Sequence, residues 1–389
     1  MLQKVSIQNF KSLKDVTLEL QKVNLLIGPN NSGKSNFLKA LEFLKLLSLN
    51  EPPTTNYFQT ITKIDDFFGK SKTSKMSFGC TLAEEEEYNM LISIEDGKYE
   101  AFNGERYETL FGIHHSDANK HAFWSEDKVI NNPPRLITMD GFPIQYFFKD
   151  FFNNLSIYKP DPNKLQNPFP ILPNQSIVNS DASNLVAFLD ILQGRYRDNF
   201  VAIENDLNKC IPEFSRIELD PVEITKDDDL FKIYRDKTFK RLGLYDKNNK
   251  LTYWADELSE GTLYFLALLC IVHQPNPPKL LLLEEPEKGI HPRRIKEVID
   301  FIFQLVEDKD IQVIMTTHSE RVLDEFEDIP EAVFIFDKDE EGATQVKNLL
   351  REVIEPSDKL MEENNLPKIK FTKSLSSHWV TGFMGGVPR

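Results

Sequence analysis

The chain opens with an alternation of apolar and polar residues that predicts strands. Val5 and Ile7 alternate with polar neighbours, as do Leu18 and Leu20, and the apolar residues Val23, Leu25, Leu26 and Ile27 follow. Alternation is typical of a strand with one buried face, and a continuous apolar run is typical of a strand buried on both faces. The next apolar positions recur at helical spacing and predict a helix: Phe37, Leu38, Leu41, Leu44 and Leu47.

Apolar and polar residues alternate again between Met76 and Ile94, on both sides of the acidic run Glu84–Glu87. We predict a hairpin with one buried face there, and we interpret the acidic run as its solvated turn. Residues 133–173 are rich in proline, asparagine and aromatic side chains. That composition predicts an irregular surface segment or an insertion that faces a partner.

The second half of the chain contains both helical and strand patterns. Apolar spacing over 185–192 and 200–207 predicts two amphipathic helices, which would form a small helical subdomain. Period-two positions near 217–219, 231–233 and 251–253 predict strands after these helices.

Composition narrows the class of protein. The 389 residues include 40% hydrophobic and 28% charged residues, which predicts one large or two medium globular domains rather than a disordered chain. The formal net charge is −15, so any contact with nucleic acid must use a local basic patch. Three basic clusters are candidates, although a solvated face is the simpler interpretation of such runs. The clusters are Arg235, Lys237, Lys240 and Arg241; Lys70, Lys72 and Lys75; and Lys368, Lys370 and Lys373.

Cysteine usage and hydropathy predict a cytoplasmic protein. Cys80, Cys210 and Cys270 are widely separated and lack the spacing of a zinc or redox site. The first residues lead into a strand rather than an apolar leader, and the apolar run Leu263–Val272 is too short to cross a bilayer. We therefore expect no signal peptide and no membrane partner.

Three histidines lie close together at His114, His115 and His121. No paired carboxylate or cysteine pattern accompanies them, and their flanks are typical of a loop. We therefore favour an ordinary loop over a metal site at these residues.

The strongest chemical signal is the sequence Gly28-Pro29-Asn30-Asn31-Ser32-Gly33-Lys34-Ser35, which is followed by Asn36. A glycine-rich turn of this kind points successive backbone N–H groups into a nest, and the following helix adds the positive end of its dipole. Lys34 would reach the β- and γ-phosphates of a nucleotide, and Ser35 would hold Mg²⁺. A chance match in a polar turn is the alternative, but the strand before it and the helix after it favour a phosphate-binding loop. We therefore predict ATP binding by residues 28–36.

Three further stretches stand at informative positions. Leu258-Ser259-Glu260-Gly261-Thr262 opens the apolar run 263–272; Leu280–Leu283 precede Glu284-Glu285-Pro286-Glu287; and the apolar run 311–317 ends in His318 and Ser319. Taken singly, their ordinary interpretations are a helix N-cap, two surface acids at a strand end and a structural histidine. Four consecutive leucines, however, predict a strand buried in a parallel sheet, and ligands bind at the carboxyl ends of such strands.

In this order, the phosphate loop, Leu-Ser-x-Gly motif, acidic strand end and histidine resemble the ATPase heads of ABC type found in SMC, RecF and OLD proteins. The chain is most similar to compact bacterial AAA/ABC ATPases of the OLD-like class. Residues 5–13, Gly289-Ile290-His291-Pro292 and Gly385-Gly386-Val387-Pro388 match that class as well. The resemblance extends over about residues 1–50 and 180–350, and only loosely over the tail.

The resemblance implies an α/β fold, a P-loop NTPase of ABC-ATPase type. We expect a mixed central sheet, an antiparallel β subdomain and a helical insertion subdomain. The expected parts are an N-terminal lobe with the phosphate loop, antiparallel subdomain and irregular insertion (1–180), a helical and β insertion subdomain (181–257), a C-terminal lobe with the signature, Walker B and switch histidine (258–350), and a tail (351–389). The glutamine of the family's Q-loop has no clear equivalent, and Gln59 is a weak candidate.

The resemblance also assigns chemical roles. Glu284 of the Walker B strand would bind Mg²⁺, commonly through water, and Glu285 would orient or deprotonate the attacking water. The general pattern has aspartate at the metal position, so Glu284 is a departure whose extra methylene changes the metal geometry. His318 would be the switch residue that contacts the γ-phosphate, and Lys34 would neutralise the developing phosphoryl charge.

The Leu-Ser-x-Gly motif implies an oligomer. In the family, Ser259 and Gly261 would contact a nucleotide that is bound by the phosphate loop of another protomer. A head-to-tail homodimer, or a larger homo-oligomer, is then expected, in which ATP joins the protomers and hydrolysis loosens them.

Full OLD nucleases carry a C-terminal Toprim domain. About fifty residues follow Asp337, fewer than an ordinary domain of roughly 100–150 residues, so we expect no nuclease here and interpret Asp337 and Asp339 as turn residues. Our hypothesis is a sensor or regulatory ATPase in phage defence or DNA maintenance. Its effector, such as a nuclease, would be a separate protein, and DNA or RNA contact is left open.

Other functions stay open. The departure at Glu284 keeps a nucleotide-gated, non-hydrolysing assembly scaffold as the alternative. The ATPase subunit of a transporter is less favoured, because the Q-loop is unplaced and a long insertion separates Gly33 from Ser259. A P-loop kinase is least favoured, since nothing in that class requires Leu-Ser-Glu-Gly-Thr before Walker B.

Overall fold

The computed structural model describes residues 1–44, 75–82, 87–97, 106–115, 121–125, 152, 155–223, 232–234, 236–288, 290–367, 369, 371 and 374–386. Several residues named above lie outside these ranges: Leu47, Gln59, Lys70, Lys72, Glu84, Glu85, Glu86, Phe231, Arg235, Gly289, Lys368, Lys370, Lys373, Val387 and Pro388. The chain divides into two compact units, Met1–Leu155 with Gln312–Arg389 and Ser156–Ile311. The four-part division expected from the resemblance stays a prediction.

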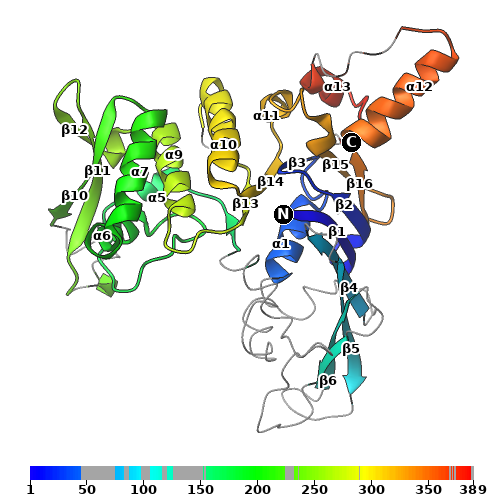
Figure 1. Cartoon of the computed structure of the whole chain (residues 1–389), viewed down its shortest axis with the longest axis horizontal. Coiled ribbons are helices and arrows are strands. Elements are labelled where there is room, and N and C mark those ends of the chain that lie inside the picture. The colour runs from blue at the N-terminus through cyan, green and yellow to red at the C-terminus, as the bar shows by residue number, and fades with distance from the viewer. Residues whose placement is uncertain are drawn as a thin grey trace. The chain divides into compact units, whose positions relative to one another are not determined.

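The first unit contains two sheets and the helices that follow their strands (Figure 1). Its elements are β1 Leu2–Phe10, β2 Leu13–Glu19, β3 Val23–Ile27, α1 Lys34–Leu44, β4 Lys75–Leu82, β5 Glu87–Gly97, β6 Arg106–His115, β7 His121–Ser125, β14 Gln312–Thr317, α11 Glu320–Asp324, η4 Pro330–Ala332, β15 Val333–Lys338, β16 Thr344–Asn348, η5 Leu349–Ile354, α12 Glu355–Glu363 and α13 Leu375–Val380.

One sheet of this unit has central strands that are buried on both faces. Its strands lie in the order β16, β15, β3, β14; β3 runs parallel to β15 and β14, and β16 is antiparallel to β15. All five residues of β3 and all six of β14 are buried, as expected for parallel strands that are covered on both faces. The predicted third strand and the predicted helix after it are confirmed.

The other sheet of this unit is antiparallel, in the order β2, β1, β4, β5, β6, β7. Val5 and Ile7 of β1 are buried while Lys4 is exposed, so the alternation in the sequence gives the strand one core face. The hairpin predicted between Met76 and Ile94 is confirmed as β4 and β5. The loop predicted around the histidines is wrong, because His114 and His121 are directly paired positions of β6 and β7.

The second unit combines a small antiparallel sheet with a bundle of helices (Figure 1). Its elements are β8 Ile157–Tyr158, α5 Pro162–Leu165, β9 Phe169–Pro170, α6 Leu185–Arg195, α7 Arg197–Cys210, β10 Phe214–Val222, β11 Phe239–Asp246, β12 Leu251–Trp254, η2 Ala255–Glu257, α9 Glu260–Val272, β13 Leu280–Glu284, η3 Pro292–Arg294 and α10 Ile295–Lys309.

Helix α9 is the centre of this unit. Every residue from Gly261 to Val272 is buried, as expected for a helix that is apolar on all sides. Helices α6 and α7 lie beside α9 on one side and beside the sheet of β10, β11 and β12 on the other (Figure 1). Both amphipathic helices predicted from the sequence are therefore confirmed, as is the fold class of mixed and antiparallel sheets with a helical subdomain.

Three local predictions need correction. Ile233 lies in a helical turn with 69% of its surface exposed, so the strand predicted there is wrong. Part of the segment predicted as irregular forms β8, α5 and β9. Asp339 is the predicted turn residue, because its carboxylate accepts the N–H groups of Glu341 and Ala343, but Asp337 belongs to strand β15.

No helix among the described residues combines the length and apolar character needed to cross a membrane.

Candidate functional site

The phosphate loop connects β3 to α1 in the first unit. Its two glycines have positive φ angles, +155° at Gly28 and +111° at Gly33. A Cβ atom at Gly28 would overlap the carbonyl oxygen of Phe336, and one at Gly33 would overlap the side chain of Thr344. Glycine is therefore required twice, for backbone conformation and for space.

Lys34 is the first residue of α1, and its side chain folds back onto the loop. Its Nζ donates to the carbonyl oxygens of Gly28 and Pro29, at 2.8 and 2.9 Å, and lies 3.4 Å from the Oγ of Ser32. Only 4% of the residue is exposed. A buried ammonium is costly unless it is hydrogen bonded, and here the loop itself supplies the acceptors. The loop therefore holds a positive charge at the amino end of a helix.

Two residues outside the loop fix its shape. The Thr344 hydroxyl donates to the carbonyl oxygen of Ser32 at 2.9 Å, and it lies 2.8 Å from the hydroxyl of Ser12. Asn36 donates from its amide to the same Ser12 hydroxyl at 2.9 Å. Ser12 belongs to the opening stretch 5–13 that carries part of the resemblance, whereas no sequence signal marks Thr344.

His318 follows β14, at the edge of the sheet from which the phosphate loop emerges. Thr317 of β14 pairs with Ile27 of β3 in parallel register, so His318 and Gly28 are the next residues on neighbouring strands. The Thr317 hydroxyl accepts the N–H of Ser319 at 2.9 Å and fixes the turn that contains His318. The first unit thus brings together two sites that the sequence separates by most of its length.

Glu284 and Glu285 lie at the end of β13 in the second unit. The four leucines before them are at most 1% exposed, which confirms the predicted buried strand. Strand β13 pairs in parallel with β8, in a register that places Leu283 opposite Tyr158. Glu285 follows the strand with a left-handed backbone, φ +51°. Non-glycine residues with this conformation are uncommon and cluster at functional sites.

Lys159, the residue after β8, binds both of these carboxylates. Its Nζ lies 3.3 Å from an Oε2 atom of Glu284 and 3.3 Å from one of Glu285. Partial burial disfavours the ammonium, but the Glu284 and Glu285 carboxylates prevail and raise the pKa of Lys159. Lys159 could not be identified from the sequence, because a strand of two residues is too short to show an alternation of apolar and polar positions.

The donor set at this strand end fits a hard cation. Carboxylate oxygens are the ligands that Mg²⁺ prefers, and one ammonium already lies within 3.3 Å of both Glu284 and Glu285. Among the described residues, no group of three or more His, Cys, Asp or Glu side chains is gathered as a metal site. Two carboxylates with remaining positions for water and phosphate oxygens are typical of Mg²⁺ in nucleotide sites.

The Leu-Ser-x-Gly motif begins α9 in the second unit. Ser259 is the N-cap, because its Oγ accepts the N–H of Thr262 at 3.1 Å and lies 2.8 Å from the Thr262 hydroxyl. The nearest atom to a Cβ added at Gly261 would be Cδ of Arg294 at 3.5 Å, an ordinary contact distance. The N-cap interpretation is thus confirmed, and the contact of Ser259 and Gly261 with a second protomer stays a prediction.

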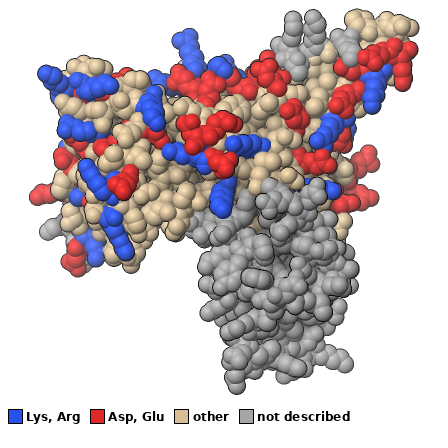
Figure 2. All heavy atoms as spheres, viewed as in Figure 1, with Lys and Arg blue, Asp and Glu red and all other residues tan. Residues whose placement is uncertain are grey.

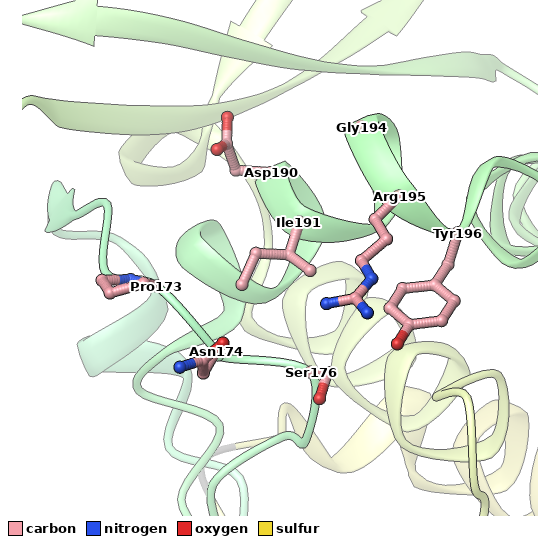
Figure 3. A pocket seen from close by; sticks show the side chains of 8 residues that line it. All are labelled: Pro173, Asn174, Ser176, Asp190, Ile191, Gly194, Arg195 and Tyr196. Atoms are coloured by element: carbon pink, nitrogen blue, oxygen red, sulfur yellow. The ribbon is translucent and has the colours of Figure 1, made fainter.

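The second unit also contains an open pocket of about 290 Å³ that is lined by none of the predicted site residues. Figure 3 shows it between the carboxyl half of α6 and the segment 173–176, with the Arg195 and Tyr196 side chains next to each other at one end. Its volume is at the lower limit of ordinary ligand pockets, roughly 300–1,000 Å³. We assign it no role in nucleotide binding.

Two described residues of the basic clusters, Lys240 and Arg241, have partners within the fold. Lys240 binds Asp190 at 2.6 Å, and the Arg241 guanidinium lies 3.6 Å from the centre of the Trp254 ring. On the face drawn in Figure 2, acidic and basic side chains of the described residues are interspersed. These partners account for Lys240 and Arg241 within the fold, and contact with nucleic acid stays a prediction.

Comparison with known proteins identifies the family. Residues 23–324 match the family described as "AAA domain, putative AbiEii toxin, Type IV TA system". The chain belongs to this family. The AAA domain makes the protein an ATPase, so the predicted enzyme class and the predicted P-loop ATPase are confirmed. The OLD-like branch stays a prediction.

The chain is also similar to a curated relative and to solved structures. The chain is 26% identical to an "ATP/GTP phosphatase" of Helicobacter pylori (strain ATCC 700392 / 26695) over 358 residues, 83% of this chain and 87% of that protein. A crystal structure of an SMC head bound to the C-winged helix domain of ScpA is 15% identical, with a TM-score of 0.49, and covers 89% of this chain and 96% of its own. The SMC head domain of Thermotoga maritima is 16% identical, with a TM-score of 0.40, at 89% and 98% coverage.

Proposed function

We propose that this AAA domain is an ATP-dependent switch that binds ATP with Mg²⁺ through residues 28–36, hydrolyses it, and controls a separate effector protein. The observation that carries the proposal is the phosphate loop itself. Its glycines permit no side chain, and its lysine is buried in hydrogen bonds to the loop carbonyls. An ammonium and successive N–H groups at the start of a helix are suited to a polyphosphate.

Binding and chemistry would be divided among different residues. Lys34 exchanges its loop carbonyls for β- and γ-phosphate oxygens, and the charge-assisted hydrogen bonds compensate for the carbonyls it leaves. Ser35 and Glu284 are the residues that would hold Mg²⁺, which on binding neutralises phosphate charge. Glu285 orients the attacking water and accepts its proton, and His318 contacts the γ-phosphate. The name of the Helicobacter pylori relative, "ATP/GTP phosphatase", supports hydrolysis and adds GTP as a second nucleotide to test.

The signature motif supports assembly. Ser259 is exposed and caps helix α9, whose amino end carries the positive end of the helix dipole and favours an anion. We propose that these groups contact a nucleotide held by a second copy of the chain in a head-to-tail dimer. A role in phage defence or DNA maintenance, with an effector such as a nuclease, is the function in which such a switch would be used.

The test measures phosphate release from ATP and GTP, and the mass of the protein with and without ATP and Mg²⁺. Wild-type protein should turn over and should form an ATP-dependent oligomer. Lys34→Ala should weaken ATP binding about 10- to 100-fold, the value of charged hydrogen bonds. Glu285→Gln should bind ATP but lose about 10²- to 10⁴-fold in turnover, as expected for a missing general base, and should accumulate the oligomer.

Lys39→Ala is the matched control, because Lys39 is an exposed lysine on the same helix as Lys34. It should behave as wild type in all assays. Absence of turnover in a wild-type protein that still assembles with ATP would instead favour the non-hydrolysing scaffold. Equal ATP binding by wild type and Lys34→Ala would contradict both functions.

A further inference from the structure

We propose that Lys159 is a built-in competitor for the metal, a counter-ion that occupies the Glu284 and Glu285 carboxylates until a divalent cation displaces it. This inference rests on the proposed function, since it concerns the metal that accompanies ATP. It gives a role to a residue of the segment 133–173, for which the sequence indicates no chemical role.

The backbone holds Lys159 in place independently of its side chain. Its N–H donates to the carbonyl oxygen of Ser180 at 2.7 Å, and the preceding Tyr158 pairs with Leu283 in the parallel register of β8 and β13. The parallel pairing brings the residue after β8 and the residues after Leu283 to the same end of the two strands. The Lys159 ammonium is therefore delivered to the glutamates by the strand pairing.

The Glu284 and Glu285 side chains are about three-quarters buried, with 23% and 24% of their surfaces exposed. Two partly buried carboxylates at adjacent positions repel each other unless a cation lies between them. The Lys159 ammonium satisfies this condition, since its Nζ is 3.3 Å from an oxygen of each. Lys288 is a poorer candidate, because its Nζ lies 3.8 Å from Glu285 alone and its side chain is 68% exposed.

An ammonium and a divalent cation cannot share these oxygens. Mg²⁺ binds carboxylate oxygens at about 2.0–2.1 Å in a strict octahedral shell, whereas an ammonium is a point charge with three rotatable donors. The like charges of the two cations repel each other at such distances. Because the Lys159 side chain is 39% exposed and flexible, it can leave the carboxylates toward solvent. Displacing it costs the energy of its two ion pairs, so Lys159 should weaken the binding of the metal.

The experiment titrates the protein with Mn²⁺ alone and follows the free ion by electron paramagnetic resonance. Lys159→Met removes the charge and keeps the stem, and it should raise Mn²⁺ affinity about three- to tenfold, the range that part-exposed ion pairs carry. Lys159→Arg keeps the charge and should stay within about twofold of wild type. In Lys159→Met protein, the further change Glu284→Gln should cancel the gain.

Lys164→Met is the matched control, since Lys164 also makes an ion pair in this unit, with Asp181 at 2.7 Å. It should leave Mn²⁺ affinity unchanged. Equal affinity in Lys159→Met and Lys164→Met, or a lower affinity in Lys159→Met, would overturn the proposal. Thermal melting of every variant distinguishes these outcomes from a folding defect.

A separate arm measures a fluorescent ATP analogue without metal, in wild type and Lys34→Ala. In one outcome, the analogue binds to wild type, Lys34→Ala abolishes this binding, and Mn²⁺ affinity is the same in wild type and Lys159→Met. The inference about Lys159 then fails and the proposed nucleotide site stands. If wild type does not bind the analogue, the proposed function fails whatever Mn²⁺ does.

Discussion

Thr344 lies against Gly33 where the phosphate loop has no side chain. The Thr344 hydroxyl donates to the carbonyl of Ser32 at 2.9 Å, and a Cβ atom at Gly33 would overlap that hydroxyl. The first residue of β16 thus determines the shape of a loop that belongs to the other end of the sequence.

Replacing Gly33 by alanine should distort the loop. The new Cβ would meet Thr344, and φ +111° is unfavourable for any L side chain, so we expect a loss of about 1–3 kcal/mol of stability and a loss of ATP binding. Gly342→Ala is the control: its φ is +82°, but nothing lies within 4 Å. It tests conformational strain without the overlap. Differential scanning fluorimetry with and without ATP measures both effects, and equal behaviour of the two variants would contradict the role of Thr344.

Replacing Thr344 by valine should remove the hydroxyl and preserve the shape. The buried Ser32 carbonyl would lose its donor and the Ser12 hydroxyl would lose a partner, which costs about 1–3 kcal/mol. ATP affinity should fall in parallel, and Thr344→Ser should restore both. Thr381→Val, at a hydroxyl that donates to Ser377 on an exposed surface, should change stability by less than about 0.5 kcal/mol. Chemical denaturation measures the free energy of unfolding of these variants. A Thr344→Val protein as stable as wild type would contradict the prediction.

Local patterns of apolar residues in the sequence predicted the regular strands and helices of this fold. The burial of β13 and α9 follows directly from unbroken apolar runs, and that of β3 from an apolar run interrupted only by Asn24. The loop glycines follow from the conformation that a phosphate loop requires. Residues such as Lys34 and Ser259 were identifiable because they stand at a fixed place beside a predicted strand or helix.

The residues that the sequence could not reveal act across the fold. Thr344 contacts the phosphate loop through sheet pairing, and Lys159 reaches its glutamates from a strand of two residues. Strand β11 was hidden because it carries Lys240 and Arg241, whose charges are paired in the fold with Asp190 and stacked on Trp254. In each case the partner lies elsewhere in the sequence, so the local pattern of apolar and polar residues does not reveal the contact.

The left-handed backbone of Glu285 predicts a trade between stability and activity. At φ +51°, glycine avoids a cost of roughly 1–2 kcal/mol that L residues bear in this conformation. Glu285→Gly should therefore melt at a higher temperature than Glu285→Ala, by about 1 kcal/mol in free energy, whereas both variants are expected to lose ATP turnover if Glu285 has the proposed role. Because both variants lack the Glu285 carboxylate, the difference in their stability reports the backbone conformation alone.

The matched pair is Glu297→Gly and Glu297→Ala, at an exposed position in the first turn of helix α10. There alanine should be the more stable by about 1 kcal/mol. The same order of stability at both sites would show that the Glu285 backbone is not strained.

A buried histidine predicts how stability changes with pH. His273, at the carboxyl end of α9, lies with its Nε2 2.7 Å from Asp206, which also binds Lys209 and Lys309 at 2.7 and 3.0 Å. Burial lowers the pKa of His273 below 6.5, and the hydrogen bond to Asp206 only partly opposes it. Burial opposes the charge of Asp206 as well, but its hydrogen bonds to Lys209, His273 and Lys309 prevail and hold the pKa of that carboxyl well below its usual range.

The lowered pKa values of His273 and Asp206 determine in which direction stability changes with pH, and over which range of pH. Below pH 6.5 the unfolded chain protonates this histidine before the folded protein does, so the stability that neutral His273 contributes falls as the pH falls through 6.5. Asp206 stays charged in both states until the pH approaches 3.8, so its contribution is lost only below that value. His273→Gln keeps a donor for Asp206 without a titrating group. Melting temperatures from pH 7.5 to 4.5 should therefore fall more steeply for wild type than for His273→Gln, and parallel curves would rule out His273 as the source of acid sensitivity.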